Sequence, residues 1–190
     1  MKRFVVLMLV VAASLTLSAQ AQRGFTTLFD GKNLDNFNKV GDANWAIVDG
    51  AVQADKGMGG YLVTKQSYGD FEIKAEFWVD TPANSGIFIR CANPQMPGGD
   101  TCYEVNIYDT RPDPAYATGA IVNVAKVAPP IKAAGKWNTY EIRAQGSHLE
   151  VTLNGKKTVD VRDDKHARGP FGLQYGAGVV KFRNVQVRPL

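Results

Sequence analysis

Apolar and polar residues alternate with a period of two over much of this chain, which predicts β-strands. The run 71–79 reads FEIKAEFWV, with an apolar residue at every odd position. The run 140–144 repeats this pattern, with Tyr140, Ile142 and Ala144 on one face. Strands of this kind have one face in a core and the other in solvent. No helical period persists beyond residue 21, and a helix around 112–117 would be short.

Turn residues divide the chain into short strands, and two dipeptides predict tight hairpins. Asp-Gly and Asn-Gly pairs supply the two positive φ angles that a two-residue type I′ turn needs. We expect one hairpin over 45–54, around Asp49-Gly50, and a second over 149–161, around Asn154-Gly155.

The last strand, 179–188, changes phase along its length. Val180 and Phe182 share one parity and Val185 and Val187 the other, so a β-bulge is expected near Arg183-Asn184. The strand near 25–29 is a candidate neighbour of this last strand, which would bring both chain ends into one sheet.

Composition fits one all-β domain. The chain has 190 residues, 45% of them apolar, with 19 glycines and 9 prolines. Short strands separated by turn residues at this spacing predict a two-sheet antiparallel sandwich of the jelly-roll type. We expect a single domain over residues 22–190.

Residues 1–21 have the pattern of a signal peptide. Lys2 and Arg3 precede the apolar run 4–13, and Ala19-Gln20-Ala21 fits a cleavage site. The run is short for a membrane span, which needs about 20 residues. The expected location is the periplasm or the outside of the cell, with no membrane attachment after cleavage. The alternative is an uncleaved N-terminal anchor.

Charge and cysteine content narrow the possible partners. The formal net charge of +4 includes Lys2 and Arg3, and the other basic residues are scattered among acids, so no nucleic-acid-binding surface is indicated. Export permits a disulfide between Cys91 and Cys102, and the alternative is two buried thiols. No zinc or redox motif is present.

One strand face carries the residues of greatest chemical interest. In the expected strand 102–109, Glu104, Asn106 and Tyr108 share the face opposite Tyr103, Val105 and Ile107. If the strand 85–91 pairs with it, Arg90 lies beside this row. A carboxylate, an amide, a phenol and a guanidinium suit the hydroxyls and C–H faces of a sugar. The alternative is an ordinary solvated face with an Arg–Glu pair.

Other polar and aromatic residues are weaker candidates. His148 and His166 lie in expected turns or loops, and Asp163 and Asp164 are adjacent on a loop, where solvated side chains are typical. The three tryptophans suit a core or its rim better than a sugar platform; they are Trp45, Trp78 and Trp137.

Several short blocks in order along the chain resemble the 3-keto-disaccharide hydrolase domain family, from about Phe25 to Leu190. The blocks are LFDGKNL at 28–34, YGDFE at 68–72, NSGIFIR at 84–90, YEVNIYD at 103–109, TGAI at 118–121, GKWN at 135–138, LNG at 153–155, GLQ at 172–174 and FRNV at 182–185.

The resemblance implies a concanavalin-like jelly roll that cleaves glycosides oxidised to a ketone at C3. Such chemistry needs a base for the C2 proton, an electrophile for the enolate and an acid for the leaving group. The resemblance makes Glu104 the base and Arg90 an oxyanion or substrate clamp. A divalent metal could serve as the electrophile. Substrate contacts are expected from Asn84, Asn106, Tyr108, Asp109 and Lys126.

The chain also departs from the family pattern. Many members have Leu-Gln-x-His-Gly where this chain has Leu173-Gln174-Tyr175-Gly176-Ala177, and many have Gln where Asn106 stands. Two alternatives to an exported enzyme therefore stay open. One is a carbohydrate-binding module without catalysis, and the other is a structural or protein-interaction sandwich.

Overall fold

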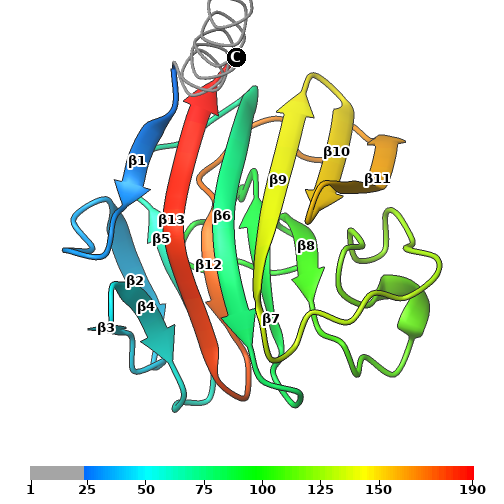
Figure 1. Ribbon diagram of the computed structural model, residues 1–190. Coiled ribbons are helices and arrows are strands. Elements are labelled where there is room, and N and C mark those ends of the chain that lie inside the picture. The colour runs from blue at the N-terminus through cyan, green and yellow to red at the C-terminus, as the bar shows by residue number, and fades with distance from the viewer. Residues whose placement is uncertain (1–23) are drawn as a thin grey trace, which may run out of the picture.

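The computed structural model describes residues 24–190 as two antiparallel sheets packed face to face. Figure 1 looks onto the larger sheet, with the smaller one behind it. The eight-stranded sheet contains β1 (Thr26–Phe29), β3 (Ala46–Val48), β4 (Ala51–Ala54), β6 (Phe71–Val79), β9 (Trp137–Gln145), β10 (His148–Leu153), β11 (Lys156–Arg162) and β13 (Val180–Pro189). The five-stranded sheet contains β2 (Phe37–Gly41), β5 (Gly60–Thr64), β7 (Ser85–Ile89), β8 (Tyr103–Ile107) and β12 (Gly172–Tyr175).

The core lies between the two sheets, as the alternation of the sequence predicts. Every odd position of β6 is buried, and Tyr140, Ile142 and Ala144 of β9 are buried beside it. The rings of Phe77 and Tyr140 stack with their centroids 4.9 Å apart. The five-stranded sheet contributes the inward side chains of β7, β8 and β12 to the same apolar cluster. The all-β sandwich expected from the sequence is therefore confirmed.

Both predicted hairpins are present, and each turn has the expected backbone. Asp49 and Asn154 have φ angles of 50°, and the glycines that follow them are also at positive φ. These turns join β3 to β4 and β10 to β11.

The two ends of the described segment, residues 24–190, lie together in the larger sheet, where β1 pairs with β13. The register of β13 with β6 shifts between Arg183 and Gln186, and Asn184 has a φ of 49°, which places the predicted bulge. Val180, Phe182, Val185 and Val187 are all buried, so the bulge keeps the apolar side chains inward on both sides of the phase change.

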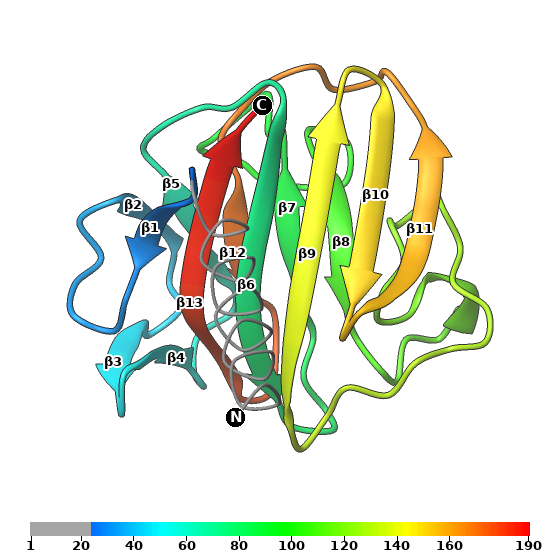
Figure 2. The same cartoon turned by 45° about the horizontal axis from the view of Figure 1, so that its top comes forward.

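A long excursion between β8 and β9, residues 108–136, covers part of the outer face of the five-stranded sheet. It contains the 3-10 turn η1 (Pro114–Tyr116), which is the short helix expected there. Figure 2 shows this segment at the edge near β8 and β11. None of the helical segments in residues 24–190 has the length and apolar character to cross a bilayer. The signal peptide expected over residues 1–21 lies outside the described residues.

Candidate functional site

The outer face of the five-stranded sheet has glycines at two paired positions near Glu104. Gly172 of β12 pairs with Phe88 of β7, and Gly86 of β7 pairs with Asn106 of β8. A Cβ atom at Gly86 would lie 3.4 Å from Cγ of Glu104, so the neighbouring side chains close over this position. Elsewhere on this side of the sheet lies a groove of about 490 Å³, within the range of small-molecule sites, and its lining includes Tyr61, Asn84 and Gln174.

Glu104 projects from this face as the second residue of β8, opposite Phe88. Its side chain is half-buried, and this burial raises the pKa of the carboxyl above its usual value, while the charge of Arg111 opposes the rise. A carboxylate with a raised pKa is a stronger base at neutral pH than an exposed one. At the position predicted from the sequence, Glu104 is therefore partly exposed to solvent and is a stronger base than a fully exposed carboxylate.

Tyr61 and Gln174 extend the polar surface from Glu104 into the groove. Tyr61 of β5 faces Gln174 of β12, and Gln174 Nε2 donates to the Tyr61 hydroxyl over 3.4 Å. The Tyr61 ring meets Phe88 edge-on, with centroids 5.2 Å apart. Burial first, and the Glu104 charge also, raise the pKa of Tyr61, so its phenol stays protonated at neutral pH.

The groove also contains an amide and an oxygen without a partner. Asn84 lines it, and the Asn84 backbone pairs with Ala177 across the sheet edge. Gln174 Oε1 is a buried oxygen without a hydrogen-bond partner within residues 24–190. A ligand hydroxyl could satisfy that acceptor, since buried polar atoms normally have partners.

Arg90 does not lie beside Glu104, and this corrects the position expected from strand alternation. Its φ of 53° breaks the alternation at the end of β7 and turns the side chain away. The guanidinium is 1% exposed and donates to the carbonyl oxygens of Gly69, Gly146 and His166 at 2.9, 2.7 and 3.3 Å. It also donates to Asp70 Oδ1 at 3.1 Å. Arg90 therefore joins separate chain segments and is not placed to clamp a substrate.

Asn106 shares the outer face with Glu104, as predicted, but the 108–136 excursion covers it. Asn106 is fully buried, and its Nδ2 donates to the Tyr116 carbonyl over 2.5 Å. The pattern of one strand could not show that a later segment would fold over the amide. Asn106 is therefore not available for direct contact with a substrate in this structure.

Asp109 turns inward and anchors the excursion, so it too is not a surface contact. Its carboxylate accepts from the Thr118 hydroxyl at 2.6 Å and from the backbone N–H groups of Ala133 and Ala134 at 2.7 and 2.9 Å. The side chain is 8% exposed. The strand ends at Ile107, and the turn that follows explains why parity no longer places Asp109.

Two further predicted contacts lie at the edge of the excursion. Tyr108 is half-buried just beyond β8, and its backbone N–H donates to the Thr118 hydroxyl over 2.9 Å. Lys126 is exposed, with its Nζ 5.9 Å from the centre of the Tyr116 ring. Neither lines the groove beside Tyr61, whereas Asn84 does.

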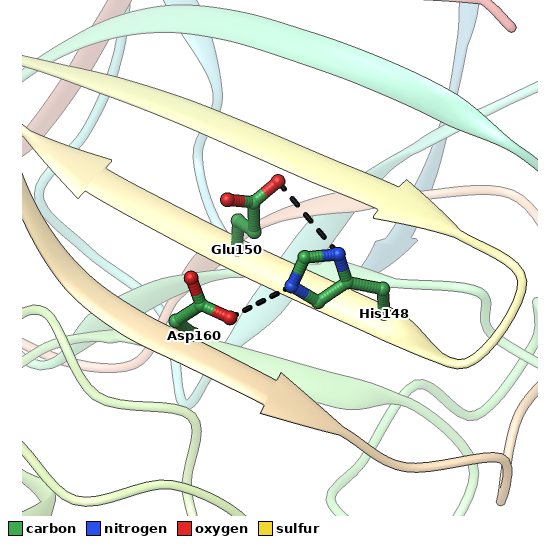
Figure 3. A group of neighbouring side chains, drawn as sticks. All are labelled: His148, Glu150 and Asp160. Atoms are coloured by element: carbon green, nitrogen blue, oxygen red, sulfur yellow. Dashed lines mark hydrogen bonds and ion pairs between the residues drawn. The ribbon is translucent and has the colours of Figure 1, made fainter.

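Among the described residues, the side chains with metal-ligating spacing are His148, Glu150 and Asp160, on the outer face of the larger sheet (Figure 3). His148 Nε2 lies 2.7 Å from Asp160 Oδ1, and Nδ1 lies 4.0 Å from Glu150 Oε2. The Lys157 ammonium already bonds both carboxylates, so an ion-pair network accounts for this cluster. Within residues 24–190, no three His, Cys, Asp or Glu side chains come together around Glu104, and this side-chain set does not fit the metal that the resemblance allows.

The residues that sequence reasoning missed are Tyr61, Gln174 and Arg111. Tyr61 and Gln174 lie 113 positions apart in the chain, and β-sheet pairing alone brings them together. Position 174 stood in a matching family block, which was the available signal. The two cysteines form a disulfide, Cys91–Cys102, packed against Phe88 on this same face.

Comparisons with known proteins identify the family of this chain. The domain described as 3-keto-alpha-glucoside-1,2-lyase-like matches residues 24–188. A 3-keto-disaccharide hydrolase of Bacteroides thetaiotaomicron is 33% identical over 87 residues, which cover 40% of this chain and 30% of that protein. The match thus spans less than a third of that relative.

Solved structures show the same sandwich. A proposed glycosyl hydrolase of Parabacteroides distasonis is 27% identical, with a TM-score of 0.72 over 87% of this chain and 99% of its own. A second one from that organism, 19% identical, has a TM-score of 0.77 over 88% and 94%. A carbohydrate-binding module of Bacillus subtilis, 17% identical, has a TM-score of 0.63 over 87% and 95%. The last two show the fold alone.

Proposed function

We propose, from the premise that this chain belongs to the family of 3-keto-α-glucoside-1,2-lyase-like domains, that it cleaves 3-keto-glycosides by elimination and hydration. The observation that carries the proposal is Glu104, a half-buried carboxylate of raised pKa on the outer face of the five-stranded sheet, close enough to Tyr61 for its charge to raise the pKa of that phenol. One group suits proton removal and the other suits proton donation.

In the first step Glu104 removes the C2 proton of the sugar. The neighbouring C3 ketone acidifies that proton, and the electron pair forms an enolate. The glycosidic bond at C1 then breaks, and the leaving oxygen takes a proton from the Tyr61 hydroxyl. The products are the free alcohol and an unsaturated 3-keto sugar, with one proton on Glu104 and a phenolate at Tyr61.

In the second step water adds across the double bond. The Tyr61 phenolate takes a proton from the water as its oxygen bonds to C1, and Glu104 returns its proton to C2. Both groups regain their starting states, and the net reaction is hydrolysis. Gln174 and Asn84 orient the sugar by hydrogen bonds, since both amides line the groove.

A divalent metal is not written into these steps. In the part of the chain that the structure describes, three His, Cys, Asp or Glu side chains gather at His148, Glu150 and Asp160 on the other sheet and not around Glu104. Parallel turnover assays with and without a chelator test whether the divalent metal that the resemblance allows takes part in the reaction. Unchanged turnover after chelation would support a reaction that the protein side chains carry out alone.

The deciding experiment compares Glu104→Gln with unmodified protein on a 3-keto α-glucoside and on its unoxidised parent. We expect release of the alcohol from the keto form only, and a loss of at least about a hundredfold in kcat for the variant. Glu141→Gln, an exposed acid on the other sheet, is the matched control and should keep full activity. Equal turnover by Glu104→Gln would refute the assignment of the base.

Tyr61→Phe tests the acid through the leaving group. A leaving alcohol of high pKa needs a proton as the C1 bond breaks, whereas a nitrophenolate leaves without one. We expect the variant to lose turnover with a 3-keto-disaccharide and to keep most of it with a 3-keto nitrophenyl glucoside. Equal losses on both substrates would assign Tyr61 to positioning.

A carbohydrate-binding module is the second candidate, and the departures at Asn106 and Gly176 favour it. Its prediction is sugar binding that Glu104→Gln leaves unchanged, with no alcohol released from any keto form. Export to the periplasm or beyond is likewise a proposal; the disulfide Cys91–Cys102 supports it because exported proteins fold under oxidising conditions. N-terminal sequencing of the mature protein would test the cleavage after Ala21.

A further inference from the structure

Two methionines with unusual exposure line the groove beside Tyr61. Met58 is 94% exposed and Met96 is 71% exposed, and both are walls of the same groove. Isolated exposed apolar residues are common and need no explanation. Two flexible apolar side chains on the walls of one groove form a more specific arrangement, because each adds apolar surface to a rim around a site that also contains the polar side chains of Asn84 and Gln174.

The backbone holds both methionines in place while their side chains stay in solvent. The Met58 N–H donates to Asp42 Oδ1 over 2.8 Å. The Met96 N–H donates to the Asn93 carbonyl over 3.2 Å, and the Met96 carbonyl accepts from the Thr101 hydroxyl at 3.0 Å. These hydrogen bonds fix the backbone from which each methionine side chain projects, so the fold sets the position of the rim.

The two residues come from opposite ends of the sheet. Met58 precedes β5 and Met96 follows β7, and these strands run in the same direction because each is antiparallel to β12. The connection that carries Met96 therefore folds back across the outer face to reach the groove. The disulfide Cys91–Cys102 closes this connection at its base.

The lining of the groove has a polar part and an apolar part. Gln174, Asn84 and the Tyr61 hydroxyl supply hydrogen-bonding groups, and Met58, Met96 and Pro97 supply apolar surface. A glucose ring alone matches only the first part. A second sugar would also place hydroxyls against the methionines, which offer them weak acceptors at most.

We propose that the methionine rim is a subsite for an aromatic aglycone, so that the substrate class is aryl glycosides. Methionine is adaptable and its sulfur contacts aromatic rings favourably, which suits aryl groups of differing shape. The inference rests on the proposed function for the position of the glycosidic bond, between Tyr61 and the rim. Binding of the aryl group itself does not depend on turnover.

The test measures dissociation constants by calorimetry for three unoxidised ligands, which are 4-nitrophenyl α-glucoside, methyl α-glucoside and a glucosyl-glucose disaccharide. We expect the aryl ligand to bind about tenfold more tightly than the other two, a difference of about 1.4 kcal/mol. Met58→Ala with Met96→Ala should remove this advantage. The double leucine variant should keep part of it, because Leu retains the apolar surface without the sulfur.

Ile47→Ala is the matched control, because Ile47 is an exposed apolar residue outside the groove, on β3. It should leave all three constants unchanged. Equal affinity for the aryl and methyl ligands in unmodified protein would overturn the proposal, as would an aryl advantage that survives in the double alanine variant. A methionine-dependent aryl advantage without cleavage of the 3-keto form would instead overturn the enzymatic function and keep the subsite.

Discussion

Replacing Arg90 by Met should destabilise the fold strongly and leave the chemistry of the folded protein intact. Met has a similar length and no hydrogen-bond donor. The change leaves the carbonyls of Gly69, Gly146 and His166 without the guanidinium and removes the partner of Asp70. These groups belong to segments far apart in the chain, so the guanidinium joins regions that no single strand connects.

The magnitude follows from the burial of Arg90. Removing one partner of a buried charged pair costs about 3–5 kcal/mol. Asp70 is 42% exposed, and it keeps a bond from the Gly146 N–H at 2.9 Å. The part of the free-energy cost that comes from Asp70 is therefore small, and we expect a total cost in the lower half of the range, about 3–4 kcal/mol. For a domain of this size each kcal/mol lowers Tm by about 2–4 °C, so we expect a fall of about 10 °C.

Thermal and urea unfolding would measure the change, with Arg162→Met as a control at an exposed arginine of β11. The control should shift the free energy of unfolding by less than about 0.5 kcal/mol. Turnover of Arg90→Met, assayed well below its Tm, should stay within a few-fold of unmodified protein. A variant with normal Tm and abolished turnover would refute this reasoning and restore Arg90 as a substrate clamp.

Three further predictions concern the same face. Glu104→Gln should raise Tm at pH 7, because the raised pKa of Glu104 means that its charged form is less favourable in the folded state than in the unfolded state. This gain in Tm should vanish as the pH falls below about 4, where Glu104 is protonated in both states. Replacing Cys91 and Cys102 by Ala should cost about 3 kcal/mol in urea unfolding, for a cross-link that spans 11 positions; an unchanged midpoint would contradict it. Gly169→Ala should prevent normal folding, as judged by circular dichroism, because its Cβ would lie 2.3 Å from the Cys91 carbonyl oxygen, whereas Gly98→Ala, with no atom within 4 Å, should fold normally.

Local pattern was sufficient for most of the sandwich. The two turn dipeptides, the alternation of β6 and the phase change of β13 each depend on a few neighbouring residues, and each prediction is confirmed. The pairing of β1 with β13 could be suggested from the sequence, because a sandwich must place the first and the last strand in one of its sheets.

Strand parity predicted the orientation of a site residue only where that residue stays within a regular strand and no other segment covers it. Glu104, the second residue of β8, faces outward as parity requires. Arg90 and Asp109 lie just beyond strand ends, where a positive φ or a turn replaces the alternation, and both turn inward. Asn106 keeps its parity but is covered by a segment that begins after its own strand ends. Burial by a distant segment depends on tertiary packing, which strand periodicity does not contain.

Tyr61 and Gly176, the position where many family members have histidine, line the same groove. The Gly176 N–H donates to the Asn84 carbonyl over 2.9 Å. A Cβ at position 176 would come within 2.9 Å of that same oxygen, so this close pairing of Asn84 with Gly176 leaves no room for a side chain. A histidine at position 176 therefore does not fit this backbone, and the proposed reaction takes its proton from another group. Tyr61, whose pKa burial raises, is linked to Gln174, two residues before the glycine. Tyr61 is the acid proposed for this face, and the leaving-group dependence of Tyr61→Phe is the measurement most sensitive to that assignment.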